Sequence, residues 1–410
     1  MNPSSHSPRY WPLVLAATAT LMVTMGIRQS MGLFVNPIVS ATGLGIAQIS
    51  FSLAIGQFVW GAVQPLFGAV ADQKGPGRVL VAGGLLLVVG TALVPFFDSQ
   101  WGLLVTLGVL TAAGAGAGSF SVLIGATAQH VPAERRSMVG GVINAGGSLG
   151  QFLFAPFVQA LISAFGWAAA MWTLAVTALS TLPLAWPLRR RDSSAGTTAA
   201  ATAVAPTGMT LREQLGIALR DRSYWCLHIG FFTCGVHIAF LVTHLPNEIA
   251  LCGLSPQVSA ISLGLIGLFN IGGSLGIGWL GQRYRMKHLL ALMYASRAAL
   301  IAVYLASPPT PLTFFLFAAG LGLTWLATVP PTAGLVGKLF GPRYLGTLFG
   351  LTLLSHQVGG FLGAWVGGLV VERFGGYSWM WYADIALALL AAAANLPIRE
   401  SRVVLRPATA

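Results

Sequence analysis

The chain consists of long, almost uninterrupted runs of apolar residues separated by short polar turns. A run of about 20 apolar residues can cross a hydrocarbon layer of roughly 30 Å as a helix. Twelve such runs can be placed, at residues 11–38, 45–71, 78–97, 101–129, 138–163, 166–188, 223–247, 257–281, 288–306, 311–336, 344–370 and 377–397. The pattern therefore predicts an all-α polytopic membrane protein with twelve transmembrane helices.

Composition and the placement of charge agree with this prediction. Of the 410 residues, 55% are hydrophobic and only 8% are charged, whereas about a quarter of a soluble globular chain is charged. The net charge of +12 does not indicate nucleic-acid binding, because every Lys and Arg except Arg28, Arg297 and Arg373 falls on one side of the twelve spans. Basic loops mark the cytoplasmic side. We therefore expect a multi-pass protein of the cell (inner) membrane, in contact with lipid, with both termini cytoplasmic.

A polar stretch divides the predicted spans into two sets of six. Residues 189–222 open with three arginines and continue through Ser-, Ala-, Thr- and Gly-rich sequence, which is typical of a flexible linker. The stretch ends on a short amphipathic segment from Thr210. We expect an N-terminal six-helix bundle at 1–188, a cytoplasmic linker with a short amphipathic helix at 189–222, and a C-terminal six-helix bundle at 223–410.

The two halves resemble each other when the first is shifted by 209 residues. Parallel repeats of this kind are a known transporter plan, in which the substrate site lies where the repeats meet. The shift pairs Thr24 with Thr233, Gly26 with Gly235, Arg28 with His237, Pro37 with Pro246, Gln48 with Gln257 and Ser50 with Ser259. On this plan Arg28 and His237 are expected to face each other across a central cavity.

The turn after the second predicted span, GAVADQKGPGR at 68–78, carries a motif. It resembles the signature of the major facilitator superfamily, with Gln73 where a basic residue is usual, and residues 278–285 form a degraded copy. The resemblance implies two pseudo-symmetric six-helix bundles that rock against each other. It also implies a conformational role for the motif, with Gly68 as a position of close helix approach. The motif residues are Gly68, Asp72, Lys74, Gly75 and Arg78.

Other stretches resemble the bacterial monocarboxylate and oxalate/formate-type branch of that superfamily. Thr210-x-x-Glu213 followed by Arg222-Ser-Tyr-Trp225 is similar to the entry to the seventh span in that branch, as is His244-Leu-Pro246 at its far end. The chain departs from the branch in two places. The eighth span shows Asn270 where members carry charged residues, and the eleventh shows His356 and Gln357 where oxalate-type members place a Lys.

Arg28 lies in the middle of the first apolar run. A guanidinium stays protonated, and a charge at membrane depth costs several kcal/mol unless it faces a wet cavity or a partner. Three interpretations follow. Arg28 binds an anionic group, for which its planar fork is suited. Alternatively it pairs with Asp384, the clear intramembrane acid, or it lies closer to the membrane interface than the span boundaries indicate.

The seventh span carries His237 and His244, which lie seven residues apart and hence on one helix face. Histidine titrates near neutral pH, so it can carry a coupling proton or bond the substrate, although a packing role is an open alternative. No cluster of acids or cysteines accompanies these histidines, so we expect no metal. The proton-coupling candidates are His237 and Asp384. The substrate-binding candidates are Arg28, His237, His244, Asn270, Gln151, His356 and Gln357.

These observations favour a secondary active transporter of small organic anions, in particular monocarboxylates, that works by alternating access with proton coupling or anion exchange. No phosphate-binding loop is encoded, so we expect neither an enzyme nor a cofactor. The expected partners are the anion, a coupling proton and lipid, and we expect a monomer. Two alternatives stay open: an exporter of drug-like or siderophore-like amphipathic compounds, and a transporter-like sensor.

Overall fold

The structure is a computed structural model that describes residues 10–128, 131, 136–189, 210–281, 283–341 and 345–401. These residues form helices and connecting turns, without a strand among them. Ten helical stretches within them are long and apolar enough to span a membrane. One of the ten, Val139–Leu188, contains two spans joined at Gly166, and α17 supplies the last span, which confirms the predicted all-α fold with twelve spans.

The first six spans are built from helices that are interrupted at several points. Positive φ at Gly43, Gly75 and Gly166 ends α2, α3 and the first part of α8, as expected for a residue without Cβ. Within the fourth span, η3 is a π-helix, a form often found at functional sites. The elements are α1 (Trp11–Gln29), η1 (Met31–Phe34), α2 (Val35–Thr42), α3 (Ile46–Lys74), α4 (Pro76–Leu93), η2 (Val94–Phe96), α5 (Gln100–Leu103), η3 (Leu104–Thr111), α6 (Ala112–Ala117), α7 (Phe120–Ala128), α8 (Arg136–Leu179) and α9 (Thr181–Leu188).

The other six spans follow α10 (Leu211–Arg220). That short helix begins with a capping box, in which Thr210 and Glu213 satisfy each other's backbone N–H groups. The hydrogen bond from the Thr210 backbone lowers the pKa of the Glu213 carboxyl. The remaining elements are α11 (Arg222–Leu251), α12 (Pro256–Leu280), α13 (Met286–Ala306), α14 (Pro311–Thr324), α15 (Val329–Phe340), α16 (Leu345–Phe374) and α17 (Ser378–Asn395).

Glycines hold the two main helix pairs, α1–α8 and α11–α16, in close contact. A Cβ at Gly150 would collide with the backbone of Met22, and a Cβ at Gly359 would collide with the backbone of Phe232. Small residues allow this approach between membrane helices. The same 209-residue shift that relates Gly26 to Gly235 also relates Gly150 to Gly359. The internal repeat therefore corresponds to equivalent helix pairs in the two halves.

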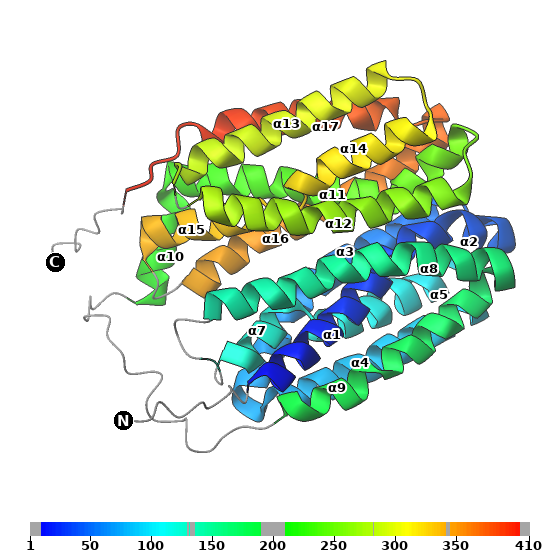
Figure 1. The fold of residues 1–410 in the computed structure, drawn as a ribbon, viewed down its shortest axis with the longest axis horizontal. Helices are drawn as coiled ribbons and strands as arrows, with labels where there is room; N and C mark the ends of the chain where they lie inside the picture. Colours follow the sequence, from blue (N-terminus) through cyan, green and yellow to red (C-terminus); the bar gives the residue numbers. More distant parts are fainter. Residues whose placement is uncertain are drawn as a thin grey trace, which may run out of the picture.

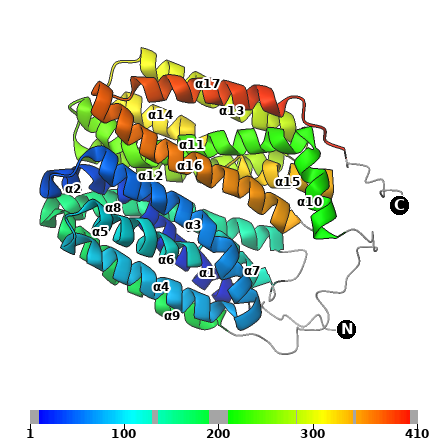
Figure 2. The ribbon, with the colours of Figure 1, turned by 180° about the vertical axis from the view of Figure 1, so that it is seen from behind.

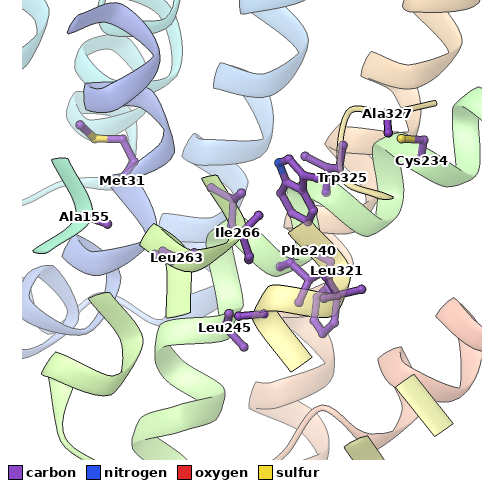
Figure 3. Close-up of a cluster of buried hydrophobic side chains, with 14 of the residues drawn as sticks. Met31, Ala155, Cys234, Phe240, Leu245, Leu263, Ile266, Leu321, Trp325 and Ala327 are labelled. Atoms are coloured by element: carbon purple, nitrogen blue, oxygen red, sulfur yellow. The ribbon is translucent and has the colours of Figure 1, made fainter. Parts of the chain in front are cut away.

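The two halves lie side by side and diverge toward the ends that carry both termini (Figures 1 and 2). They touch through α3 with α16 and through α8 with α12. Along α3, the contacts run from Ala47, which bonds Glu372, to Gly61, which packs against Gln357. A cluster of buried hydrophobic side chains, including Met31 of the first half and Ile266 of the second, crosses between the halves (Figure 3). The molecule is therefore closed on the side away from the termini.

Candidate functional site

Arg28 lies one residue before the end of α1, and its guanidinium is held by neutral groups. It donates to Oε1 of Gln29 at 3.2 Å and to Oε1 of Gln57 on α3. Its guanidinium carbon lies 4.1 Å from the centre of the Trp60 ring, in a cation–π contact. Among the described residues, no carboxylate lies within ion-pair distance of Arg28. The arginine is thus positioned by its neighbours but not neutralised by them.

Arg28 and Gln57 line a pocket that is formed mainly by the first half. Most of the other walls are apolar, and the π-helix η3 contributes Leu107 and Thr111 to them. The second half closes the pocket through Val242 and Thr243 of α11. The pocket thus combines a single cation with mainly apolar walls.

His237 and Asp384 form a buried pair inside the second half. Nδ1 of His237 bonds Oδ2 of Asp384 on α17, and each side chain is 1% exposed. The ring of His237 also lies 6.3 Å from that of Trp325, centre to centre. The other polar atoms of the pair, Nε2 of His237 and Oδ1 of Asp384, have no hydrogen-bond partner in the described part of the chain. The structure therefore brings together the two predicted proton-coupling residues, but it does not place His237 opposite Arg28 or Asp384 beside Arg28.

His244 and Asn270 are engaged in structural hydrogen bonds. The ring nitrogens of His244 bond Oη of Tyr377 at 3.0 Å and the carbonyl of Ala364 at 2.7 Å. Asn270 donates through Nδ2 to Oγ of Ser148 at 2.9 Å. Neither His244 nor Asn270 lines the pocket of Arg28.

The other three candidates lie where the halves meet or next to that contact. Gln151 accepts a long hydrogen bond from Gln29 at 3.5 Å, and its Nε2 is buried without a partner among the described residues. Gln151 is thus linked to Arg28 through Gln29. Gln357 packs against Gly61 of α3. His356 contacts the ring of Phe231 at 5.4 Å, within the second half.

Gln57 and Trp60 are site residues that the sequence reasoning missed. They lie three residues apart on α3, so both can reach the same neighbour on α1. The available signal was Gln57 itself, an amide in the middle of an apolar run. Without knowledge of which face of α3 meets α1, that signal could not be connected to Arg28.

Arg297 is a second buried cation, and it serves the backbone. Its Nη2 donates to the carbonyls of Thr324 and Trp325, the latter at 2.8 Å, where α14 ends. Its Nη1 lies 3.4 Å from Sγ of Cys234. The last carbonyls of a helix lack partners within the helix. Here the guanidinium of Arg297 donates the hydrogen bonds that these carbonyls need. These contacts give Arg297 a role in helix packing.

The predicted conformational motif lies at the connection between α3 and α4. Lys74 ends α3, Gly75 turns the chain with φ +87°, and Arg78 is exposed in the first turn of α4. The side chain of Asp72 lies outside the described residues. A Cβ at Gly68 would meet no atom of the described residues within 4 Å. The expectation of close helix approach at Gly68 is therefore wrong for this conformation, in which the halves diverge at that end.

Two related sets of six spans, with a pocket where they meet, define the protein as a polytopic helical membrane transporter. The family model of the Major Facilitator Superfamily matches residues 15–364. The chain belongs to that superfamily, and it is a transporter, not an enzyme.

The chain is also similar to transporters of known name and to solved structures that share its fold. It is 28% identical over 380 residues to "Monocarboxylate transporter 13" of Rattus norvegicus, covering 90% of this chain and 84% of that protein. It is 23% identical over 373 residues to the "Oxalate:formate antiporter" of Oxalobacter formigenes, covering 90% and 86%. A crystal structure of a D-xylose-proton symporter matches with TM-score 0.73 and 15% identity, over 95% of this chain and 97% of that one. A bacterial homologue of the lysosomal transporter Spinster, inward-facing, matches with TM-score 0.69 and 14% identity, over 94% and 93%.

Proposed function

We propose that this protein carries a small monocarboxylate across the cell (inner) membrane by alternating access. The observation that carries the proposal is the pocket of Arg28, in which a fixed cation without an acidic partner faces mainly apolar walls. A carboxylate supplies the missing negative charge, and the planar guanidinium can bind both of its oxygens. A compact apolar tail fits walls such as Ile27, Met31 and Leu53. The names of the relatives agree with such a substrate.

The site favours one carboxylate over two. A dicarboxylate would bring a second charge, and Arg28 is the single Lys or Arg among the residues that line the pocket. A buried charge without a partner is costly. We therefore place oxalate-like anions below monocarboxylates in affinity.

The proposed coupling ion is a proton, and its proposed site is His237 with Asp384. The pair is buried and has one unpaired atom on each side chain among the described residues. Imidazole nitrogens and carboxylate oxygens are groups that can hold a transported proton. The proposal places the proton site in one half of the molecule and the anion pocket mainly in the other, so both halves take part in each cycle.

The proposed topology and organisation follow the charge pattern. The positive-inside rule places both termini in the cytoplasm. The structure is then closed toward the outside, because the halves touch on the side away from the termini. We retain the N-terminal bundle at 1–188, the linker at 189–222 and the C-terminal bundle at 223–410 as functional units, acting within a monomer.

The test is a thermal-shift screen of the purified protein against acetate, lactate, benzoate and oxalate at one ionic strength, followed by uptake into proteoliposomes. A ligand that binds the folded state raises the melting temperature. We expect stabilisation by at least one monocarboxylate in the wild type and in Arg373→Ala, which removes an exposed arginine on α16. We expect none in Arg28→Ala. Stabilisation and uptake that survive in Arg28→Ala would exclude Arg28 as the anion site.

A further inference from the structure

The tenth span is broken between α14 and α15, and side chains from other helices hold the break. The α14–α15 break comprises Trp325–Thr328. Arg297 of α13 binds the carbonyl of Trp325, and Asn270 of α12 accepts a hydrogen bond from the N–H of Leu326 at 3.0 Å. Thr328 contacts Sγ of Cys234 on α11 at 3.5 Å. Backbone groups freed by a break must be satisfied inside a membrane, and here Arg297 and Asn270 bond two of them, while Cys234 contacts only the side chain of Thr328.

Asn270 joins this break to the opposite half of the molecule. Its Oδ1 accepts from Leu326, while its Nδ2 donates to Oγ of Ser148 on α8. Both residues are buried, Asn270 to 1% and Ser148 to 6% exposure. One turn before Asn270, a Cβ at Gly267 would lie 2.7 Å from the carbonyl oxygen of Ser148. The amide therefore sits directly at the α8–α12 contact between the halves.

The proton-site pair lies against the same break. The ring of His237 contacts that of Trp325, the first residue of the break. Figure 3 shows Trp325 between Ile266 of α12 and Cys234 of α11. Titratable and charged groups also gather on the other side of the break. Arg297 of α13 contacts Cys234, which lies one turn before His237 on α11, and the ring of Tyr294. Gain or loss of a proton at His237 and Asp384 thus changes the charge beside the α14–α15 break. Asn270 holds the backbone of this break through Leu326.

We propose that Asn270 is the positioning residue that couples the proton load of His237 and Asp384 to the closure of the two halves, through the α14–α15 break. This inference rests on the proposed proton site. Because Asn270 binds the break and Ser148 at once, a shift of the break changes the α8–α12 contact. Asn270 then passes a movement of the break on to the α8–α12 contact, and it does not contact the substrate.

The test measures closure directly and needs no substrate. Spin labels at Ser40 and Ser378, both exposed and on the side away from the termini, report the separation of the halves there. Cys252 is replaced by Ser so that it does not react with the label. Cys226 and Cys234 are buried and are kept. The distance distribution is measured in lipid nanodiscs between pH 5 and 9. We expect the wild type to change with pH and Asp384→Asn to lose that change.

A comparison of Asn270→Ala with a control variant on the same helix separates the inference from a general effect on packing. We expect Asn270→Ala to lose the pH response of the distance, and Ser148→Ala to lose it as well. Ser262→Ala is the matched control, since Ser262 is buried on the same helix and its hydroxyl has no partner among the described residues; it should respond as the wild type does. Folding is checked by thermal unfolding of each variant.

Three outcomes are informative. Loss of the pH response in Asn270→Ala with retention in Ser262→Ala supports the inference. An unchanged response in a folded Asn270→Ala overturns the inference and leaves the proposed proton site intact. Absence of any pH response in the wild type overturns both, whereas the anion pocket is then still decided by the Arg28→Ala screen.

Discussion

Glu372 of α16 accepts a hydrogen bond from the backbone N–H of Ala47 at 2.8 Å, across the boundary between the two halves. Ala47 lies in the first turn of α3, where backbone N–H groups lack partners within the helix. Gly45 makes room for the carboxylate, because a Cβ there would collide with Oε1 of Glu372. One half thus caps a helix of the other, and it can do so only while the side away from the termini is closed.

We predict that Glu372→Ala weakens this closure. Removal of a capping group typically costs about 0.5–2 kcal/mol, which would shift the equilibrium between closed and open toward open by roughly twofold to thirtyfold. Measured with the labels at Ser40 and Ser378, the distribution should move to longer distances. Arg373→Gln, at the neighbouring exposed position, is the control. Equal distributions in Glu372→Ala and the wild type would show that the cap does not hold the halves together.

We predict that Gln57→Leu and Trp60→Leu each weaken anion binding without abolishing it. Gln57 orients the guanidinium and Trp60 supports its face, and such contacts contribute about 0.5–1.5 kcal/mol each. The readout is the ligand concentration needed for half of the maximal thermal shift, which should rise about twofold to twelvefold. Phe58→Leu lies between them on the exposed side of α3 and should leave this concentration unchanged. An effect of equal size in all three variants would argue against a specific role.

We predict strong coupling between His237 and Asp384 in a double-mutant cycle. Removal of one partner from a buried charged pair costs about 3–5 kcal/mol, because the other is left without compensation. His237→Phe and Asp384→Leu should therefore each lower the free energy of unfolding substantially, while the double variant should lose much less than the sum. The measurement is chemical unfolding in detergent. Additive losses would mean that the two side chains do not depend on each other.

We predict that Gly235→Ala and Gly276→Ala have opposite effects. A Cβ at Gly235 would collide with the carbonyl of His356, so the α11–α16 pair must move apart; overpacking of this kind costs about 1–3 kcal/mol. A Cβ at Gly276 would meet nothing within 4 Å, and Ala is favoured over Gly in a helix by up to about 1 kcal/mol. Melting temperatures of the two variants test this directly. A stable Gly235→Ala would contradict the close packing of α11 on α16.

The spans were predictable because their signal is long and continuous. Apolar runs of about 20 residues leave little choice of structure, and the predicted boundary between the spans 138–163 and 166–188 falls at the turn formed by Gly166. The π-helix of η3 lies in apolar sequence that carries no signal for it. The α14–α15 break does have a signal, because Pro330 and Pro331 directly follow it and proline suits the first turn of a new helix. The partners that stabilise this break, Arg297 and Asn270, come from distant helices and were not predictable.

The candidate site was predictable only in part. Arg28 was identified because a charge inside an apolar run is unusual. The repeat placed Arg28 and His237 at equivalent positions, but each side chain turns toward its own half, Arg28 to α3 and His237 to α17. Repeat symmetry fixes the helix on which a residue lies. The direction of its side chain depends on which neighbours offer a hydrogen bond.

The uncompensated charge of Arg28 has an electrical consequence. With a monocarboxylate bound, the pocket is neutral, so the loaded protein switches between its two sides without moving net charge there. The empty protein switches with a bare cation. One elementary charge across the full membrane field corresponds to about 2.3 kcal/mol per 100 mV. With a negative interior and the proposed topology, voltage therefore acts on the return of the empty protein and holds its pocket toward the cytoplasm.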